Sequence, residues 1–80
     1  MFYVYLLKDE KGKIYIGYTS NLKKRILEHL HKKVDATKKM KNLKLIYYEA
    51  YLDKEKAQER ERKLKQFGSS YKGLIKRLEL

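Results

Sequence analysis

Two tyrosines near the start of the chain have the spacing of residues that meet across a β-hairpin. A three-residue loop at Glu10–Gly12 would pair Tyr5 with Gly17 and Leu7 with Tyr15. Both phenols would then lie on one face, with open space beside Gly17, whereas a two-residue loop would move Tyr15 to the opposite face. Two adjacent phenols beside an open space are a candidate functional site. Plain cross-strand aromatic packing is the competing interpretation, and geometry alone favours it.

Two more candidate groups, Arg25 and His29, lie four residues apart and would project from the same side of a helix. They border an apolar stripe of Leu22, Ile26 and Leu30, which we expect to face the core. Either side chain could lie in solvent, and a lone histidine is more often structural than catalytic.

A carboxylate, Glu61, lies between Ala57 and Leu64 on the predicted inward stripe of a later helix. An unpaired buried charge is very costly, so Glu61 must be paired, hold a metal ion or reach the edge of a cleft. Arg60 and Lys65 are near in sequence, and a salt-bridged glutamate is therefore as good an interpretation as a metal ligand.

The composition excludes several other kinds of site. The chain has no Cys, which rules out disulfides, thiolate zinc sites and thiol catalysis. His29 and His31 are the only histidines and form no metal-binding pattern, the glycines are scattered, and no serine has a nucleophile-elbow context. No apolar run approaches the roughly 20 residues of a membrane span, and the start lacks the build of a signal peptide. We therefore expect a cytoplasmic protein without membrane contact.

The elements that must position these residues predict one α+β domain over residues 1–80, because so short a chain has room for only one core. Strands are predicted over 2–7, 14–18 and 43–51, helices over 22–32, 54–66 and 71–78, and a loop or short helical turn over 33–42. Helix N-caps are expected at Ser20 or Asn21 and at Asp53. The order β-β-α-β-α-α implies a small three-stranded, largely antiparallel sheet flanked by helices. Its expected core face carries Phe2, Val4, Leu6, Ile14, Ile16 and Tyr18.

A strong positive charge is concentrated in the middle of the chain. The formal net charge is +11, and residues 19–44 hold nine basic residues against only Glu28 and Asp35. This excess favours a nucleic-acid partner over an anionic membrane, since no helix pairs a basic face with Trp or a run of Phe and Leu. The lysines expected to bind the nucleic-acid backbone are Lys23, Lys24, Lys32, Lys33, Lys38, Lys39 and Lys41.

Taken in order, the candidate residues resemble the motifs of the GIY-YIG nuclease superfamily. The similarity runs through Tyr3-Val4-Tyr5, Tyr15-Ile16-Gly17, Arg25, His29 and Ala57-x-x-Arg60-Glu61-x-x-Leu64-Lys65, and so covers essentially the whole chain. The length and the Phe67-Gly68-Ser69-Ser70 segment look like the small stand-alone proteins related to the N-terminal nuclease domain of the DNA-repair excinuclease. The chain departs from the pattern at Tyr3, which replaces a glycine. Only Ser69 and Ser70 are candidates for the polar residue, often Asn, that follows the glutamate in many family nucleases.

The resemblance implies a metal-dependent endonuclease that hydrolyses DNA phosphodiester bonds with one Mg²⁺ or Mn²⁺ ion. It assigns catalytic positions to Tyr5, Tyr15, Arg25, His29 and Glu61. One tyrosine would act as general base or orient the water, Arg25 would bind phosphate, and Glu61 would hold the metal. Which tyrosine is the base is left open.

The resemblance also implies a structure-selective role in DNA repair or recombination, and the sequence leaves RNA open as a substrate. We expect a monomer that is nucleoid-associated when bound to DNA. Two alternatives remain at this point. One is a nucleic-acid-binding module of the same fold without activity, and the other is an adaptor that brings DNA to a repair-protein partner.

Overall fold

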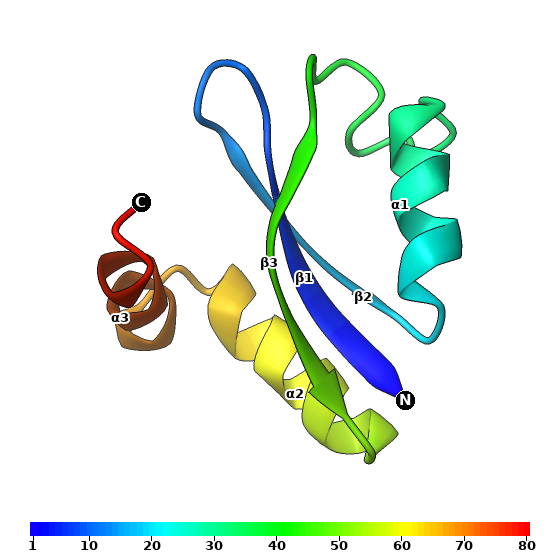
Figure 1. The fold of residues 1–80 in the computed structure, drawn as a ribbon. Coiled ribbons are helices and arrows are strands. Elements are labelled where there is room, and N and C mark those ends of the chain that lie inside the picture. The colour runs from blue at the N-terminus through cyan, green and yellow to red at the C-terminus, as the bar shows by residue number, and fades with distance from the viewer.

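The computed structural model describes residues 1–80 and contains three strands and three helices in the predicted order (Figure 1). The strands are β1 (Phe2–Lys8), β2 (Ile14–Thr19) and β3 (Lys44–Tyr51), and the helices are α1 (Leu22–Leu30), α2 (Lys54–Lys65) and α3 (Ser69–Arg77). This arrangement confirms the predicted α+β class, and every boundary lies within two residues of its expected position.

The β1–β2 hairpin has the register that a three-residue loop predicts. Tyr5 pairs with Gly17 and Leu7 with Tyr15. Gly12 closes the turn with a φ of +85°, in the left-handed region that glycine adopts at no steric cost. Both tyrosines therefore lie on the same face of the hairpin, as expected.

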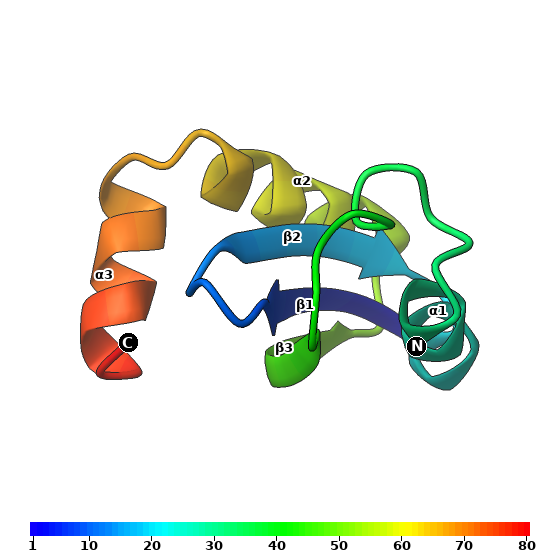
Figure 2. The same ribbon diagram turned by 90° about the horizontal axis from the view of Figure 1, so that it is seen from above.

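The sheet has the strand order β2-β1-β3, and both pairings are antiparallel (Figure 2). β1 is the central strand, so β2 and β3 each have a free edge. On β3, Tyr48 lies opposite Tyr5, and a bulge shifts the register between Leu6 and Leu7. Because directly opposed residues point to the same face, Tyr48 shares the face of Tyr5.

The main core lies on the other face of the sheet, where α2 and α3 pack (Figure 1). Alternation along the strands sends every second side chain to this face. Burial of each large apolar side chain contributes about 1.5–3 kcal/mol. The buried members of this core are Val4, Leu6, Ile16, Ala57, Leu64 and Leu74, which include the predicted stripe of α2.

A smaller buried layer covers the Tyr5 face and is formed by α1 together with the segment 31–43. This segment is a series of tight turns, with backbone hydrogen bonds from Thr37 to Val34 and from Met40 to Thr37. Its backbone thus turns three buried side chains inward, although no periodic pattern in the sequence marks them. The buried side chains of this layer are Tyr5, Leu7, His29, Val34, Thr37 and Met40.

The inward face of α1 differs from the predicted one. Leu30, expected in the core, is 50% exposed, whereas the neighbouring His29 is only 1% exposed. The prediction was wrong because both ring nitrogens of His29 have buried hydrogen-bond partners, which remove the usual cost of burying a polar ring. The helix also ends at Leu30 rather than at residue 32.

The helices begin at capped positions. The side chains of Asn21 and Asp53 accept hydrogen bonds from backbone N–H groups in the first turns of α1 and α2, which satisfies donors that have no partner within the helix. None of the three helices has the length and apolar character needed to cross a bilayer.

Candidate active site

Tyr5 begins a buried chain of hydrogen bonds that ends in the turn-rich segment after α1. Its hydroxyl oxygen is 2.7 Å from Nε2 of His29, and Nδ1 of His29 is 2.7 Å from Oγ1 of Thr37. All three side chains are buried. A neutral imidazole has one donor and one acceptor nitrogen, and a hydroxyl can serve either. The chain therefore joins a phenol to a group that can take its proton.

Gly17 provides the space for the Tyr5 ring. A methyl group at this position would overlap Cζ and the hydroxyl oxygen of Tyr5. The phenol thus lies directly against the backbone of β2, and any side chain at position 17 would push it away from His29. The open space beside Gly17 was predicted from the sequence, but the hydrogen bond between Tyr5 and His29 that depends on it was not.

The protonation of the buried pair follows from its surroundings. Burial raises the pKa of Tyr5 to about 12, and the Arg25 guanidinium offsets only part of this rise. Burial also lowers the pKa of His29, and the positive charge of Arg25 adds to the effect. Both groups are therefore neutral at pH 7. With the imidazole proton on Nδ1, the Tyr5 hydroxyl donates to Nε2 and His29 donates to Thr37.

Tyr15 lies beside the same imidazole and is partly exposed. The centroid of its ring is 5.2 Å from that of His29 and 6.3 Å from that of Tyr5. The three rings form one cluster in which His29 lies edge-to-face with both phenols. Three of the predicted catalytic residues, Tyr5, Tyr15 and His29, thus lie together.

Arg25, one turn before His29, lies near enough to Tyr5 for its positive charge to lower the pKa of the phenol, against the larger effect of burial. It also contacts Oε1 of Glu28 at 3.4 Å, and its side chain is 38% exposed. Arg25 and Lys24 line a hollow of about 210 Å³ together with Thr19 and other residues at the start of α1. Glu28, which pairs with Arg25, also lines this hollow. The hollow therefore presents two cations and one carboxylate, and an anionic group could bind at Lys24 and Arg25.

Glu61 reaches the site from α2. Its side chain is 21% exposed, and its Oε2 is 3.0 Å from Nζ of Lys65. That ammonium also lies 6.0 Å from the centroid of the Tyr15 ring, at the limit of a cation–π contact. Because α2 packs on the face opposite Tyr5, these side chains approach Tyr15 around the free edge of β2. The Glu61 carboxylate is thus salt-bridged to Lys65, which is one of the two interpretations that the sequence allowed.

Arg60, the other possible partner of Glu61, pairs instead with Glu49 on β3. Its Nε and Nη2 are each 3.0 Å from a carboxylate oxygen of Glu49, and the hydroxyls of Tyr47 and Tyr51 donate to the same carboxylate at 2.6 Å. Burial would raise the pKa of Glu49, but these hydrogen bonds outweigh it and hold the pKa below its ordinary value. The network fastens α2 to β3 immediately beside Glu61.

A divalent cation would find no ready-made cluster of protein ligands in this site. The structure has no group of three or more His, Asp or Glu side chains that could hold a metal ion. An ion held by Glu61 would therefore take most of its other ligands from water and substrate oxygens. This donor set suits Mg²⁺, which keeps several waters and commonly binds one or two carboxylates together with substrate phosphates.

The seven lysines predicted to bind nucleic acid are all exposed, two of them on α1 and five in the segment after it. Two have partners within the protein. Nζ of Lys32 donates to the Met40 carbonyl at 3.0 Å, and Nζ of Lys38 is 3.5 Å from Asp35. Lys24, which shares a hollow with Arg25, has the most direct connection to the candidate site.

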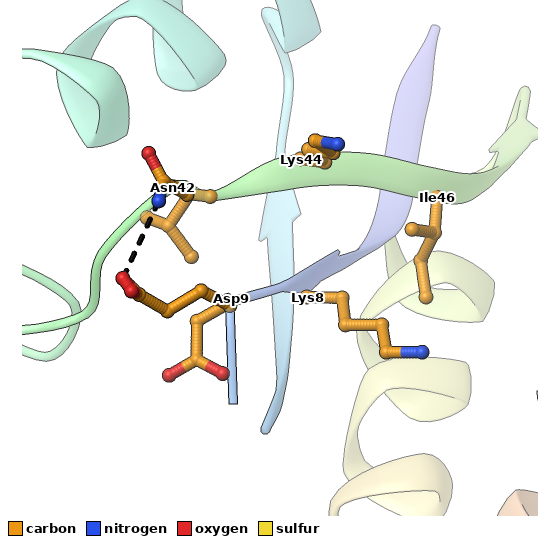
Figure 3. A pocket seen from close by; sticks show the side chains of 7 residues that line it. Lys8, Asp9, Asn42, Lys44 and Ile46 are labelled. Atoms are coloured by element: carbon orange, nitrogen blue, oxygen red, sulfur yellow. Dashed lines mark hydrogen bonds between the residues drawn. The ribbon is translucent and has the colours of Figure 1, made fainter. Parts of the chain in front are cut away.

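The largest hollow in the surface lies elsewhere. It measures about 690 Å³ and is lined by the hairpin turn and the start of β3, where Asn42 donates to Glu10 at 3.3 Å (Figure 3). None of the five candidate residues lines it. A choice of site by cavity volume alone would therefore have missed all five candidate residues.

Two residues of the site were not predicted to belong to it. Thr37 lies in a segment without periodic pattern, and no sequence signal marks it as the partner of His29. Lys65 was considered as a partner of Glu61, but its position over Tyr15 depends on how α2 packs.

Comparisons with known proteins find similarity along nearly the whole chain. The family model described as GIY-YIG catalytic domain matches residues 1–74. The chain is 35% identical over 71 residues to a UPF0213 protein of Staphylococcus haemolyticus, a match that covers 88% of this chain and 87% of that protein. It is 37% identical over 73 residues to a UPF0213 protein of Clostridium perfringens, covering 90% and 78%.

Two further matches extend this result. A UPF0213 protein from the VLF1-GP41 intergenic region of Autographa californica nuclear polyhedrosis virus is 42% identical over 48 residues, which are 59% of this chain and 46% of the viral protein. The chain thus spans less than half the length of that relative. The solution NMR structure of a UPF0213 protein from Bacillus halodurans is similar with a TM-score of 0.61 and 30% identity, over 98% of this chain and 85% of that one.

Proposed function

Because the chain belongs to the GIY-YIG catalytic domain family, to which its UPF0213 relatives also point, we propose that it is an endonuclease that hydrolyses DNA phosphodiester bonds with one divalent cation. The observation that carries this proposal is the hydrogen-bond chain from Tyr5 through His29 to Thr37, with Arg25 and Glu61 beside it. In this proposal the hydrogen-bond chain would supply the proton acceptor, Arg25 the phosphate-binding cation and Glu61 the carboxylate.

In this proposal Tyr5 and His29 together accept the proton of the attacking water. With its pKa raised to about 12 by burial, Tyr5 keeps its proton at pH 8 in the free protein, so it needs a neighbour that takes this proton when it accepts one from water. The water proton passes to the Tyr5 oxygen while the Tyr5 proton passes to Nε2 of His29. The water oxygen bonds to phosphorus while the bond from phosphorus to the leaving oxygen breaks, and the leaving oxygen takes a proton from solvent. The imidazolium is stabilised by its Nδ1–H bond to Thr37 until its extra proton returns to solvent through Tyr5.

Arg25 and Tyr15 form the side from which the substrate approaches. Tyr5 has no exposed surface in the free protein, whereas both neighbours are partly exposed. The Arg25 guanidinium binds a phosphate oxygen, because its planar fork of donors matches that geometry. Catalytic hydrogen bonds commonly tighten only when substrate binds, and substrate binding at Arg25 brings the water to Tyr5.

Glu61 is the residue that would hold the divalent cation. When bound, the ion supplies Lewis-acid stabilisation of the charge that develops on the phosphate. Until then, the ammonium group of Lys65 pairs with the Glu61 carboxylate. Mg²⁺ and Mn²⁺ are the ions that suit an oxygen-only site of this kind.

The substrate in this proposal is recognised mainly through its backbone. The net charge of +11 and the exposed lysines after Arg25 favour phosphate contacts, which position a nucleic acid without reading its sequence. We place the protein, acting as a monomer, on branched or damaged cytoplasmic DNA during repair or recombination, alone or with a repair-protein partner.

The test is cleavage of supercoiled, flap and four-way-junction DNA with Mg²⁺ or Mn²⁺. We expect at least one substrate to be cut, and Glu61→Gln to lower the rate by about 100-fold or more. Glu59→Gln is the matched control, since Glu59 lies on the same helix and also pairs with a lysine, at 3.3 Å, but is 52% exposed and outside the site. No cutting of any DNA, or equal cutting by Glu61→Gln, would contradict the proposal.

A second candidate is a nucleic-acid-binding module of the same fold without catalytic activity. The observation that favours it is that Lys65 already occupies Oε2 of Glu61, while Tyr5 has no exposed surface. It predicts binding that depends strongly on salt, persists in EDTA and survives both Glu61→Gln and Tyr5→Phe. Cleavage that depends on Glu61 would rule it out.

A further inference from the structure

The face of the sheet that carries Tyr5 continues onto β3, where it is open to solvent. Tyr48 lies opposite Tyr5 in the register, yet Tyr48 is 53% exposed and Tyr5 is fully buried. Tyr3 lies two residues before Tyr5 on the same face, and its ring centroid is 6.1 Å from that of Tyr48 in an edge-to-face contact. Tyr3 and Tyr48, which we call the aromatic step, thus lie beside the candidate active site.

The aromatic step has the chemistry to bind a flat, unsaturated ligand. An edge-to-face pair uses only one ring face, so the other faces stay available for stacking. Exposed aromatic rings on a sheet bind unpaired bases of single-stranded nucleic acids in this way, with little preference for base identity. Leu45, which is 39% exposed and pairs with Leu7 on the same face, extends the apolar surface.

The position of the aromatic step places such a base close to the phosphate-binding side chains. Tyr3 pairs on its other side with Thr19 of β2, and Thr19 lines the hollow that contains Lys24 and Arg25. Tyr3 pairs with Ala50 on β3, and Tyr48 lies two residues along that strand from Ala50. Because neighbouring strands are about 4.8 Å apart and residues along a strand about 3.4 Å apart, the path from Tyr48 through Tyr3 to Thr19 spans about 13 Å. Nucleotides close together in one unstacked strand can reach both ends of that path.

We propose that Tyr3 and Tyr48 stack an unpaired base of the nucleic acid, next to the phosphate that Arg25 binds. The inference rests on the proposed function, because it takes a nucleic acid as the ligand. It goes further by naming the substrate class, which is DNA with a single-stranded nucleotide beside the cut rather than a continuous duplex. A fully paired helix keeps its bases stacked inside and offers the two tyrosines nothing but backbone.

Charge favours a nucleic acid over a second copy of the chain as the occupant of this face. Two chains that each carry a net charge of +11 repel one another at the distances of an interface. A polyanion gains instead from Lys24 and Arg25 beside the aromatic step. A nucleic acid therefore satisfies the exposed Tyr48 ring and the positive charge of Lys24 and Arg25 together.

The test is binding of the full chain to fluorescent DNA in EDTA, so that no cutting interferes. The probes are a single strand, a blunt duplex and a duplex with a single-stranded flap. Tyr48→Ala should weaken binding of the single strand and the flap about tenfold and leave the blunt duplex unchanged, while Tyr48→Phe should keep the wild-type affinities. Phe67→Ala is the matched control, because Phe67 is 52% exposed and lies edge-to-face against Tyr71 at 4.8 Å, in the connection between α2 and α3 rather than on the sheet.

A second measurement reports contact directly. The chain has no Trp, so Tyr48→Trp places a single indole on β3 and retains an aromatic ring against Tyr3. We expect its fluorescence to be quenched by a single-stranded oligonucleotide and much less by an abasic strand of equal length. This readout does not depend on whether Tyr48→Ala keeps the native fold.

Several results would overturn the inference. Equal losses by Tyr48→Ala on single strand and duplex, equal losses by Phe67→Ala, or equal quenching by the abasic strand would each do so. So would sedimentation that shows a wild-type dimer and a monomeric Tyr48→Ala, which would make this face a self-interface. If DNA is cut but Tyr48→Ala binds normally, only the stacking site fails. If stacking is seen but no DNA is cut, only the nuclease proposal fails.

Discussion

The hydroxyl oxygen of Tyr5 and Nε2 of His29 lie 2.7 Å apart in the buried space between β1 and α1. The two residues are separated by 24 positions in the chain, so this contact forms only when α1 folds back over the hairpin. It pairs a phenol whose pKa is raised to about 12 by burial with an imidazole kept neutral for the same reason. The protonated phenol is a poor base, but the neutral imidazole can accept its proton, so together the two groups can relay a proton.

This pairing predicts that Tyr5→Phe and His29→Gln act on one step. Each change should lower the cleavage rate by about 10²–10⁴-fold, and the double variant should be no slower than the slower single variant, because the two side chains act as a unit. Single-turnover cleavage of the best substrate measures this, with circular dichroism to confirm folding. Multiplicative losses in the double variant would show that the two groups act independently.

Thr37 should matter through His29 rather than through the substrate. Thr37→Val keeps the shape of the side chain but leaves Nδ1 of His29 buried without a partner, which should lower the free energy of unfolding by about 1–3 kcal/mol. Thr37→Ser retains the hydroxyl and should restore both stability and cleavage. Urea denaturation and cleavage rates measure the two effects, and a serine variant as impaired as the valine variant would argue against the hydrogen bond.

Gly17 should tolerate no side chain, because Tyr5 occupies the space where one would lie. Gly17→Ala should lower the free energy of unfolding by about 1–3 kcal/mol through overpacking and should also reduce cleavage by displacing the phenol. Gly73→Ala is the control, since nothing lies within 4 Å of that position and a helical Gly→Ala change adds up to about 1 kcal/mol. Thermal unfolding separates the two, and a neutral Gly17→Ala would contradict the close contact.

The Glu49 network predicts a loss of stability in acid. The pKa of Glu49 in the folded protein lies below its unfolded value. Its contribution to the free energy of unfolding is therefore fully present above about pH 4.5, and it is lost as the pH falls through the lower, folded pKa. Glu49→Gln should reduce the free energy of unfolding at pH 7 by about 3 kcal/mol, because Arg60 stays partly buried without a charged partner. In this variant the free energy of unfolding should also fall less steeply between pH 5 and 3 than in the wild type.

The measurement for Glu49 is urea denaturation at several pH values, compared with Glu59→Gln. Glu59 is exposed, so its removal should leave the slope in this range close to that of the wild type. The lowered pKa of His29 adds an acid loss that starts nearer pH 6.5, but it is common to all three proteins and cancels in the comparison. An unchanged slope in Glu49→Gln would contradict the assignment.

The hairpin was predictable because its register depends on local rules. A glycine at the left-handed turn position sets the loop length, and alternation along the strands then determines that Tyr5 and Tyr15 share a face. The structure confirms both points. The inward face of α1 was predicted wrongly, since apolar periodicity favoured Leu30, whereas hydrogen bonds buried His29 in its place.

The sequence by itself determined the order of the elements, the shared face of the tyrosines and the positive charge, because turn chemistry, side-chain periodicity and composition act within a few residues. Only the tertiary structure decided which polar groups meet. Arg60 bonds to Glu49, 11 positions away, rather than to the adjacent Glu61, and Thr37 reaches His29 from a segment with no regular pattern. Such partners are selected by the packing of whole elements, which brings distant segments together and leaves each buried donor or acceptor only the partner that lies within reach.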